Sequence, residues 1–426
     1  MIRVKFNMLL VLPFLLLTVA SHANDRGDDF QALRAELLAL AKRVNALESS
    51  NHALREENER LSAARASANA TAATHGEAAM DAPATRVAAT PSWAERIKVK
   101  GDFRMRYENI DEAGRDSRNR SRLRARAAIM AAVTEDVEVG LGLASGSDDP
   151  VSSNQTLGGG GSSKDLKLDL AYFKWSGLEH LSIYGGKFKN PLYQAGGHPL
   201  LWDGDWNPEG LALSWARGDF FAHFLGTWLE SDSRNETEFS WMTQTGFSQP
   251  LGAGATLTAG LGYHHIGSAG KGTFYGDDDD FFGNSFDPAS LSYLHDYDEL
   301  EAFADLGFEI AGQPARLFLS YVHNLDASAY DTGYAAGFRY GSTSARGGWS
   351  FAYAYQDLEA DAAFALVADS DFGGGGTDVR GHLLKGGYAI AKNWNASLTY
   401  FVNQRQANAG SEHDYDRLQL DLAFKH

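Results

Sequence analysis

The stretch that decides the fold is IKVKGDFRMRYE, residues 97–108, together with RNRSRLRARAAIM, residues 118–130. In both, charged and apolar side chains alternate at nearly every second position. Successive side chains leave a β-strand on opposite faces, whereas a helix would scatter the charges around its axis. The two stretches therefore predict neighbouring strands with one apolar and one charged face. The charged face carries a column of arginines: Arg104, Arg106, Arg120, Arg122, Arg124 and Arg126.

Composition limits the classes of partner. The chain has 426 residues, no cysteine and a formal net charge of -17. An acidic chain without a basic face argues against nucleic acid as a partner. The absence of cysteine fits an oxidising compartment in a protein without disulfides.

Residues 1–23 predict a secretory signal peptide. Arg3 and Lys5 precede an apolar run over residues 8–19, and Ser21 and Ala23 occupy the two positions that signal peptidase reads. We expect cleavage after Ala23. The alternative, a membrane-anchoring helix, is disfavoured because the run is shorter than the roughly 20 residues of a membrane span.

Residues 24–62 predict a coiled coil that acts as an oligomerisation stalk. Leucine recurs at every seventh position, at Leu33, Leu40, Leu47, Leu54 and Leu61. Asn51 and Asn58 occupy the alternate seam position, which is typical of parallel dimers with a fixed register. The alternative is one amphipathic helix packed on its own domain. Residues 63–92 are rich in alanine, serine and threonine and predict a flexible linker.

From residue 93 to residue 426 the sequence predicts sixteen strands joined alternately by short turns and long loops. The strands are expected near residues 96–109, 119–133, 136–145, 164–175, 180–189, 209–217, 219–230, 237–249, 255–265, 297–310, 314–323, 331–342, 347–357, 378–390, 393–404 and 414–426. The long loops include residues 146–163, 190–208, 267–296 and 358–377. One end of the predicted strand bundle is therefore simple and the other elaborate.

The number of strands decides which face is inside. Sixteen strands closed around an apolar core would leave a hollow that side chains could not fill. Turning the apolar rows outward to lipid and the polar rows inward to water removes this conflict, and a closed barrel has no unpaired edge. The sequence thus predicts an all-β, antiparallel transmembrane barrel of about sixteen strands.

Several segments resemble the putative porins of Gram-negative outer membranes, whose members often carry a coiled coil after the signal peptide. They include GDFRMRYE (101–108), DLKLDLAYFKW (165–175), GGKFKNPLY (185–193) and LWDGDWNPEGLA (201–212). The resemblance implies a porin fold and passive diffusion of small hydrophilic solutes and ions across a membrane that contains lipopolysaccharide. One departure is His426, which ends the chain where such barrels usually end on an aromatic residue.

The resemblance also bears on assembly. Porins commonly form trimers, whereas the seam asparagines favour a dimer, so we expect a homo-oligomer of one of these two kinds. The coiled coil would lie in the periplasm, where it could contact the cell wall.

The predicted pore has two charged walls. Strands two and ten lie on opposite sides of a sixteen-stranded barrel, and strand ten carries an acidic row: Glu299, Glu301, Asp305 and Glu309. A basic wall facing an acidic wall would set up a transverse field in the lumen. The loop after strand five is expected to fold inward as a constriction, and it carries Asp203, Asp205 and Glu209. The alternative is that three acidic residues on neighbouring strands, Asp102, Glu108 and Glu138, simply neutralise the arginines.

The remaining motifs are weaker. The run Asp277–Asp280 fits either a divalent-cation bridge to lipopolysaccharide or, more commonly, a solvated loop tip. The glycine runs 158–161 and 373–376 lack the context of a phosphate loop and predict flexible external loops. We expect no enzyme activity, no metal and no cofactor. Two other classes remain open: a barrel-anchored envelope tether with little channel activity, and a soluble β protein with an oligomerisation stalk.

Overall fold

The computed structural model describes residues 42, 60, 93–232 and 237–425. The predicted signal peptide and linker lie outside the described residues, as does His426. The predicted coiled coil does so too, except for the single positions Lys42 and Arg60.

The described chain forms one 17-stranded sheet, of which sixteen strands make the wall of a barrel. The seventeenth, β4 (Gln155–Thr156), pairs with β2 inside the connection that follows β3. The wall strands are β1 (Ile97–Glu112), β2 (Arg118–Ala132), β3 (Val137–Ser145), β5 (Leu166–Leu178), β6 (Leu181–Lys187), β7 (Glu209–Arg217), β8 (Phe220–Glu230), β9 (Glu238–Gly252), β10 (Ala255–Ile266), β13 (Tyr297–Ile310), β14 (Gln313–Asn324), β15 (Thr332–Gly341), β16 (Trp349–Leu358), β17 (Val379–Ala391), β18 (Trp394–Arg405) and β19 (His413–Lys425).

Smaller elements accompany the wall in the described residues. The hairpin β11 (Phe286–Asp287) and β12 (Ser292–Tyr293) forms a separate two-stranded sheet. Five 3-10 turns are present: η1 (Trp93–Arg96), η2 (Gly159–Gly161), η3 (Ala195–Gly197), η4 (Ala365–Val367) and η5 (Phe372–Gly374). Among the described residues, no helix combines the length and the apolar character needed to cross a membrane.

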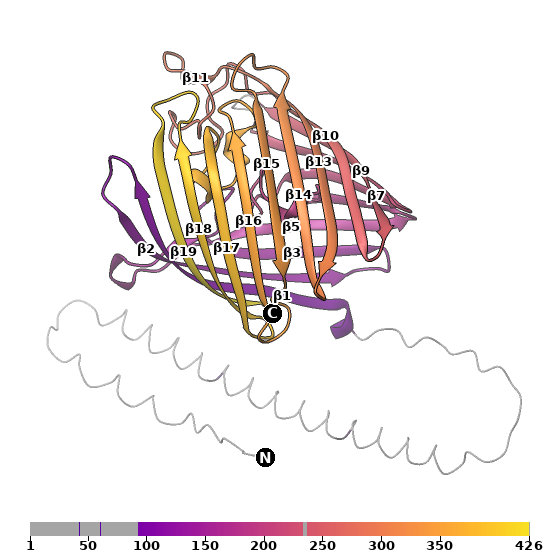
Figure 1. Ribbon diagram of the computed structural model, residues 1–426. Helices are drawn as coiled ribbons and strands as arrows, with labels where there is room; N and C mark the ends of the chain where they lie inside the picture. The colour runs from indigo at the N-terminus through magenta and orange to yellow at the C-terminus, as the bar shows by residue number, and fades with distance from the viewer. Residues whose placement is uncertain (1–41, 43–59, 61–92, 233–236, 426) are drawn as a thin grey trace, which may run out of the picture. The chain divides into compact units, whose positions relative to one another are not determined.

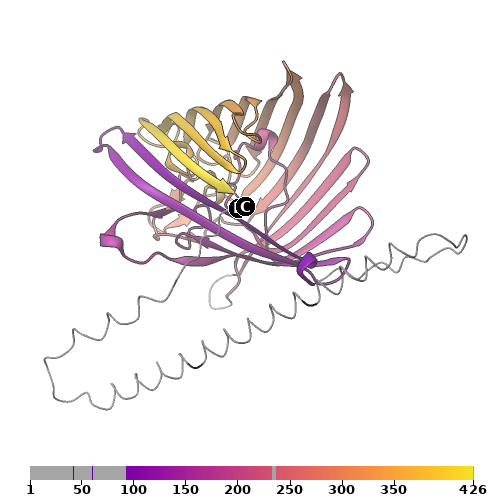
Figure 2. The same ribbon diagram turned by 90° about the horizontal axis from the view of Figure 1, so that it is seen from below.

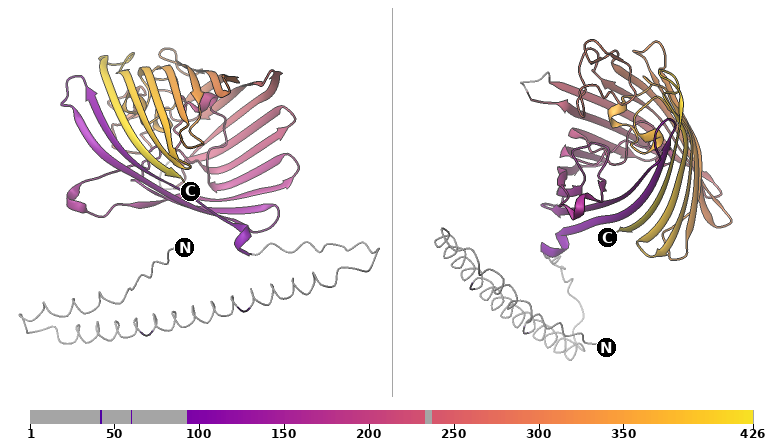
Figure 3. Two further views of the ribbon diagram at one scale, coloured as in Figure 1. Left: turned by 60° about the horizontal axis from the view of Figure 1, so that its bottom comes forward. Right: turned by 90° about the vertical axis from the view of Figure 1, so that its left-hand side faces the viewer.

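The barrel is closed by pairing of its first and last strands. β1 runs antiparallel to β19, from Asp102 opposite Lys425 to Glu112 opposite Tyr415. Figure 3 shows the indigo N-terminal strands next to the yellow C-terminal strands at this seam, and Figure 2 shows the strands surrounding the interior from below. Closure leaves no unpaired strand edge, which a β structure needs in hydrocarbon. The sequence prediction of sixteen antiparallel strands is confirmed, and β13 is the tenth wall strand.

The two faces of the wall follow the sequence alternation. On β1, Val99 is 55% exposed and Met105 49%, whereas Arg106 and Glu108, at even-numbered positions just beyond them, are 3% and 0% exposed. Large apolar side chains are exposed in the same way on the outer faces of β3, β5, β14 and β18. An apolar surface of this extent is unfavourable in water and suits contact with lipid tails.

The two ends of the barrel differ. β16 to β19 rise from short turns at the lower end to longer connections at the upper end (Figure 1). Ala253–Gly254 and Ala311–Gly312 are two-residue turns in which both residues have positive φ. This geometry matches the twist of adjacent antiparallel strands and explains why glycine is the second residue in both turns.

Two long connections pack inside the barrel. The first, residues 188–208, buries Phe188, Trp202 and Trp206, and the second, residues 359–378, buries Phe364 and Phe372. Both contribute to one apolar cluster with inward-facing wall residues.

The second connection corrects one expectation. The glycine run 373–376 was expected in a flexible external loop, but Gly373 is buried at φ 57°. A Cβ atom there would lie 2.5 Å from Cγ1 of Val379. The apolar residues of the segment draw it inward, because exposing them to water costs free energy.

Candidate functional site

The register of β1 and β2 places all six predicted arginines on one inner patch. Arg104 lies opposite Arg124, and Arg106 lies opposite Arg122. In the same ladder Arg126 lies opposite Asp102, and Arg120 lies opposite Glu108. The side chains of the six arginines are between 3% and 23% exposed. We call this patch the arginine column.

Acidic side chains of the wall neutralise part of the arginine column. Asp102 accepts from Arg126 Nε at 2.7 Å and forms an ion pair with Arg124 Nη2 at 2.9 Å. Glu108, which is fully buried, accepts from Arg120 and, at 2.6 Å, from Nη2 of Arg417. The alternative in which neighbouring acidic residues neutralise the arginines thus holds for Asp102 and Glu108. It does not hold for Glu138, which accepts from the Tyr172 hydroxyl at 3.0 Å instead.

β19 completes the patch with two residues that the sequence analysis missed. Asp421 Oδ1 accepts from Arg106 Nε at 2.7 Å, and Arg417 joins Glu108 to the second inward connection. Both lie on the inner face of β19, alternating with outward leucines at 418, 420 and 422. The alternation that revealed the column on β1 and β2 was therefore present here as well.

The connection 188–208 brings its carboxylates to the column. Asp205 Oδ1 lies 2.7 Å from Arg126 Nη1 and 3.6 Å from Arg124 Nη1. Glu209 does not share this position. It begins β7, its side chain is 63% exposed, and it pairs with Lys187 at 2.7 Å.

The connection 359–378 meets both the column and the first connection. Asp371 forms ion pairs with Arg106 at 2.9 Å and with Arg417 at 2.8 Å. Asp203 Oδ2 accepts from the backbone N–H of Ser370 at 3.0 Å and from its hydroxyl at 2.9 Å. Asp371 was not among the residues predicted from the sequence, because no sequence pattern placed this segment inside the barrel. The available signal was the run of apolar residues at 362–368, which is unusual for a solvated loop.

The carboxylates at this meeting point have different pKa values. Burial, with a contribution from Asp205, raises the pKa of Asp203 to about 6. Burial and the neighbouring Asp203 and Asp371 raise the pKa of Asp369 well above its usual value. Burial also acts on Asp371, but Arg106 and Arg417 outweigh it and hold that pKa well below the usual value. The cluster therefore contains one firmly ionised carboxylate and two that take up protons readily.

The acidic row of β13 lies on the inner face but is mostly covered. Glu299 accepts from the backbone N–H of Phe364 at 2.8 Å, and Glu301 accepts from Nε2 of Gln244 at 3.0 Å. Asp305 accepts from the Tyr193 hydroxyl, from Gly196 N–H and from Arg316. These three are 3–4% exposed.

Glu309, the fourth residue of the row, is exposed beside the short turn. The four residues of the acidic row therefore do not form the open acidic wall that the alternation predicts. The alternation fixes the face on which a charge lies, but the inward connections cover three of these four charges.

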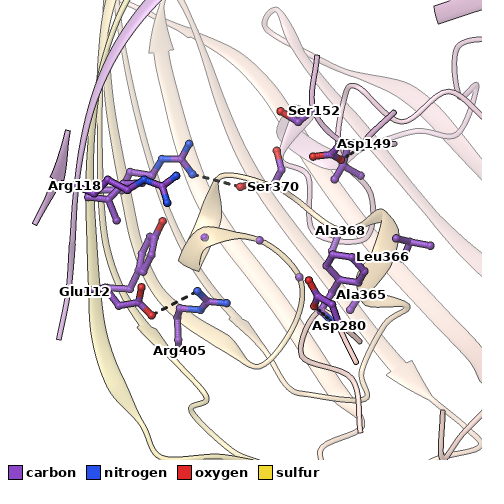
Figure 4. Close-up of a pocket in the computed structure, with 18 of the residues that line it drawn as sticks. Glu112, Arg118, Asp149, Ser152, Asp280, Ala365, Leu366, Ala368, Ser370 and Arg405 are labelled. Atoms are coloured by element: carbon purple, nitrogen blue, oxygen red, sulfur yellow. Dashed lines mark hydrogen bonds and ion pairs between the residues drawn. The ribbon is translucent and has the colours of Figure 1, made fainter. Parts of the chain in front are cut away.

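Two chambers lie on either side of the point where the connections 188–208 and 359–378 meet. One, of about 420 Å³, is lined by Arg118, Arg120, Arg122 and Ser370 and opens near the long connections (Figure 4). In Figure 4, Glu112 and Arg405 form an ion pair across from Leu366 and Ala368. We call this the loop-side chamber.

The second chamber, of about 480 Å³, is lined by Arg104, Arg106, Asp369 and Asp371 and lies toward the short turns. We call it the turn-side chamber. Because Ser370 lines the loop-side chamber and its two neighbours line the turn-side chamber, the segment 369–371 separates the two. A third cavity, of about 460 Å³, lies beside Asp205, Lys187 and Glu209.

Comparison with known families identifies the chain. Residues 110–227 and 284–426, more than half of the sequence, match the family described as "Putative porin". The chain belongs to this family. Among curated proteins, no sequence matches the chain.

Solved structures with a similar fold include the high-pH structure of OprB from Pseudomonas putida. Its TM-score is 0.53 at 12% identity, and the match covers 78% of this chain and 95% of OprB. Salmonella typhi OmpF in complex with daunomycin gives a TM-score of 0.47 at 11% identity, covering 78% of this chain and 97% of OmpF. The OprB likeness agrees with the porin barrel and bears on the fold alone.

Proposed function

We propose that this protein is an outer-membrane porin through which small hydrophilic solutes and ions diffuse passively. The observation that carries the proposal is a pair of chambers, lined by charged side chains, on either side of one meeting point inside a closed barrel. Membership of the putative porin family supports the same function. A channel of this kind needs no catalytic group or cofactor, because the solute moves down its own gradient.

The proposed path follows the arginine column. A solute enters the loop-side chamber, passes the contact between the connections 188–208 and 359–378, and leaves through the turn-side chamber. Asp203 and Asp205 belong to the constriction in this scheme, as the sequence analysis expected, and Asp371 joins them. Glu209, in contrast, lines the neighbouring cavity beside Lys187.

The proposed transverse field acts over a shorter distance than the field between two opposite walls that the sequence predicts. The arginine column provides the basic side. The acidic side consists of loop carboxylates that lie against the column, such as Asp205 and Asp371, rather than the row on β13. Opposite charges at such short range produce a strong local field that orients dipolar solutes. The β13 carboxylates act instead as anchors for the two inward connections.

The surroundings follow from the porin assignment. The outer apolar rows contact lipid, the long connections face lipopolysaccharide at the cell surface, and the short turns face the periplasm. The predicted stalk, residues 24–62, would lie in the periplasm, join subunits into a homo-oligomer, either a trimer or a dimer, and could contact the cell wall.

Conductance of the refolded protein in a planar bilayer tests the proposal. We expect steady open channels, and the triple variant Arg122→Ser, Arg124→Ser and Arg126→Ser should lower the anion-to-cation permeability ratio about tenfold, a change of about 1.4 kcal/mol. Arg217→Ser, at a short turn, is the control for charge loss outside the chambers. An unchanged ratio in the triple variant would exclude the column as the selective element.

One observation favours a second function. The two inward connections pack an apolar cluster within the barrel, which would restrict flow. A barrel that inserts but stays silent would support an envelope tether, and failure to insert would support a soluble protein with a stalk.

A further inference from the structure

The turn-side chamber contains basic groups from several wall strands. Arg104 comes from β1, Arg339 from β15 and Lys385 from β17. Arg339 and Lys385 both lie directly opposite Ala352 of β16, one on each side. The small side chain of Ala352 lies between them, and both cations line the same chamber.

The same row of the ladder continues with uncharged polar groups. Lys385 lies opposite Thr399 of β18, and Thr399 lies opposite Gln419 of β19. All of these residues line the turn-side chamber. The row therefore presents Arg339, Lys385 and Gln419 as donors along one wall.

These donors lack the carboxylate partners found elsewhere in the column. Arg339 donates to the carbonyl of Gly197 at 3.0 Å, and Lys385 has no hydrogen bond or ion pair among the described residues. The amide nitrogen of Gln419 has no partner although the residue is 2% exposed. Arg104 Nε is also unpaired, but Arg104 Nη2 donates to Oδ1 of Asn154 at 2.7 Å and Nη1 lies 3.9 Å from Oδ2 of Asp421. By contrast, Arg106 is held by two carboxylates.

Of the three donors in the row, only the Gln419 amide is both buried and unpaired, and an incoming anion would recover the free energy that its burial costs. Arg339 and Lys385 are exposed to the chamber, where their positive charges attract an anion. The lining also selects the kind of anion. Asp369 and Asp371 lie on the loop side of the chamber and disfavour a second negative charge on the ligand. Phe318, Leu383 and Phe401 add apolar surface beside the donors. The site therefore matches a single negative charge attached to an apolar body.

We propose that the turn-side chamber binds the carboxylate group of a small organic monoanion, through Arg339, Lys385 and Gln419, with the apolar body against Phe318 and Phe401. The proposal deepens the porin function and rests on it for access, since the ligand reaches the chamber through the pore. The site would make the channel favour organic acids over neutral solutes of the same size.

Binding of benzoate to the full-length protein in detergent tests the site. Equilibrium dialysis with labelled benzoate should give saturable binding, and benzamide, which has the same ring without the charge, should bind at least tenfold more weakly. Lys385→Gln should raise the dissociation constant for benzoate about tenfold, whereas Lys385→Arg should keep it within a few-fold of the parent. The matched control is Lys392→Gln, which removes one exposed cation at the turn that follows β17.

Arg339→Gln provides an independent variant should the Lys385 substitution impair folding. Equal binding of benzoate and benzamide, or unchanged binding in both variants, would overturn the proposal. Conductance in the bilayer is read separately. Saturable binding in a barrel that does not conduct would keep the site and overturn the porin function, whereas conduction without saturable binding would do the reverse.

Discussion

The arginine column and the acidic row of β13 arise from the same sequence pattern and end in different surroundings. Both are rows of charge on the inner face of the barrel. Arg120 and Arg122 of the column line the loop-side chamber, and Arg104 and Arg106 line the turn-side chamber. Glu299, Glu301 and Asp305 are instead buried under the inward connections. Alternation therefore determines the face on which a charge lies, and the connections determine whether that charge reaches the lumen.

Removing an anchor on the β13 side should have the largest effect. Asp305→Ala deletes an acceptor shared by Tyr193, Gly196 and Arg316 and leaves the buried Gly196 N–H and the half-buried Tyr193 hydroxyl without this partner. We expect a loss of about 3 kcal/mol in the free energy of unfolding, measured by denaturant titration in detergent. Because connection 188–208 would be released, single-channel conductance should rise. A stable variant with parental conductance would show that the carboxylate anchors nothing.

A substitution on the column side should change selectivity more than stability. Asp371→Asn removes the charge between Arg106 and Arg417 and keeps the shape of the side chain. We expect a loss of about 2 kcal/mol in stability and a shift of the reversal potential toward anions, because two guanidinium groups lose a counter-charge. A shift toward cations would contradict the assignment of the column as the basic side of the path.

pH should act at the meeting point of the two connections. The pKa of Asp203 rises from 3.8 to about 6 on folding, so the folded form binds the proton more tightly than the unfolded form. Although the Ser370 hydrogen bond by itself favours the ionised carboxylate, burial and Asp205 outweigh it. The packing of the two connections around Asp203 is therefore most stable below pH 3.8 and loses this stability as the pH rises through about 6. Asp369 shifts in the same direction, whereas Asp371, with its lowered pKa, stays ionised throughout this window.

Hydrogen exchange of the Ser370 amide, which donates to Asp203, measures this contact. After correction for the intrinsic exchange rate, protection should be greater at pH 4.5 than at pH 7. Asp203→Asn should reduce this difference, and Asp149→Asn, in another connection, should leave it intact. Equal protection at both pH values in the parent would rule out Asp203 as the titrating group.

The smallest effect is expected at the uncovered end of the acidic row. Glu309 shares the inner register of β13 with Asp305 but is exposed. Glu309→Gln should change stability by less than about 0.5 kcal/mol and leave the permeability ratio near that of the parent. A large change in stability or in the permeability ratio would mean that the acidic row acts as one continuous wall, even though the inward connections cover three of its four residues.

Much of the fold was predictable because strand alternation is a local property of the sequence. The sixteen strands, the assignment of β13 as the tenth and the inner position of the six arginines all follow from it. The pairs Asp102–Arg124 and Glu108–Arg120 were also foreseeable, since they join neighbouring strands. Arg417 and Asp421 could have been found by extending the same analysis to the last strand.

The sequence by itself determined which side chains face inward, because a period of two assigns every residue of a strand to one face. Only the tertiary structure decided which inward charges meet solvent. The contacts of Asp371 with Arg106, of Glu299 with Phe364 and of Asp203 with Ser370 join segments more than 60 residues apart. Such contacts depend on how the connections fold into the lumen, where burial of their apolar residues outweighs local preference.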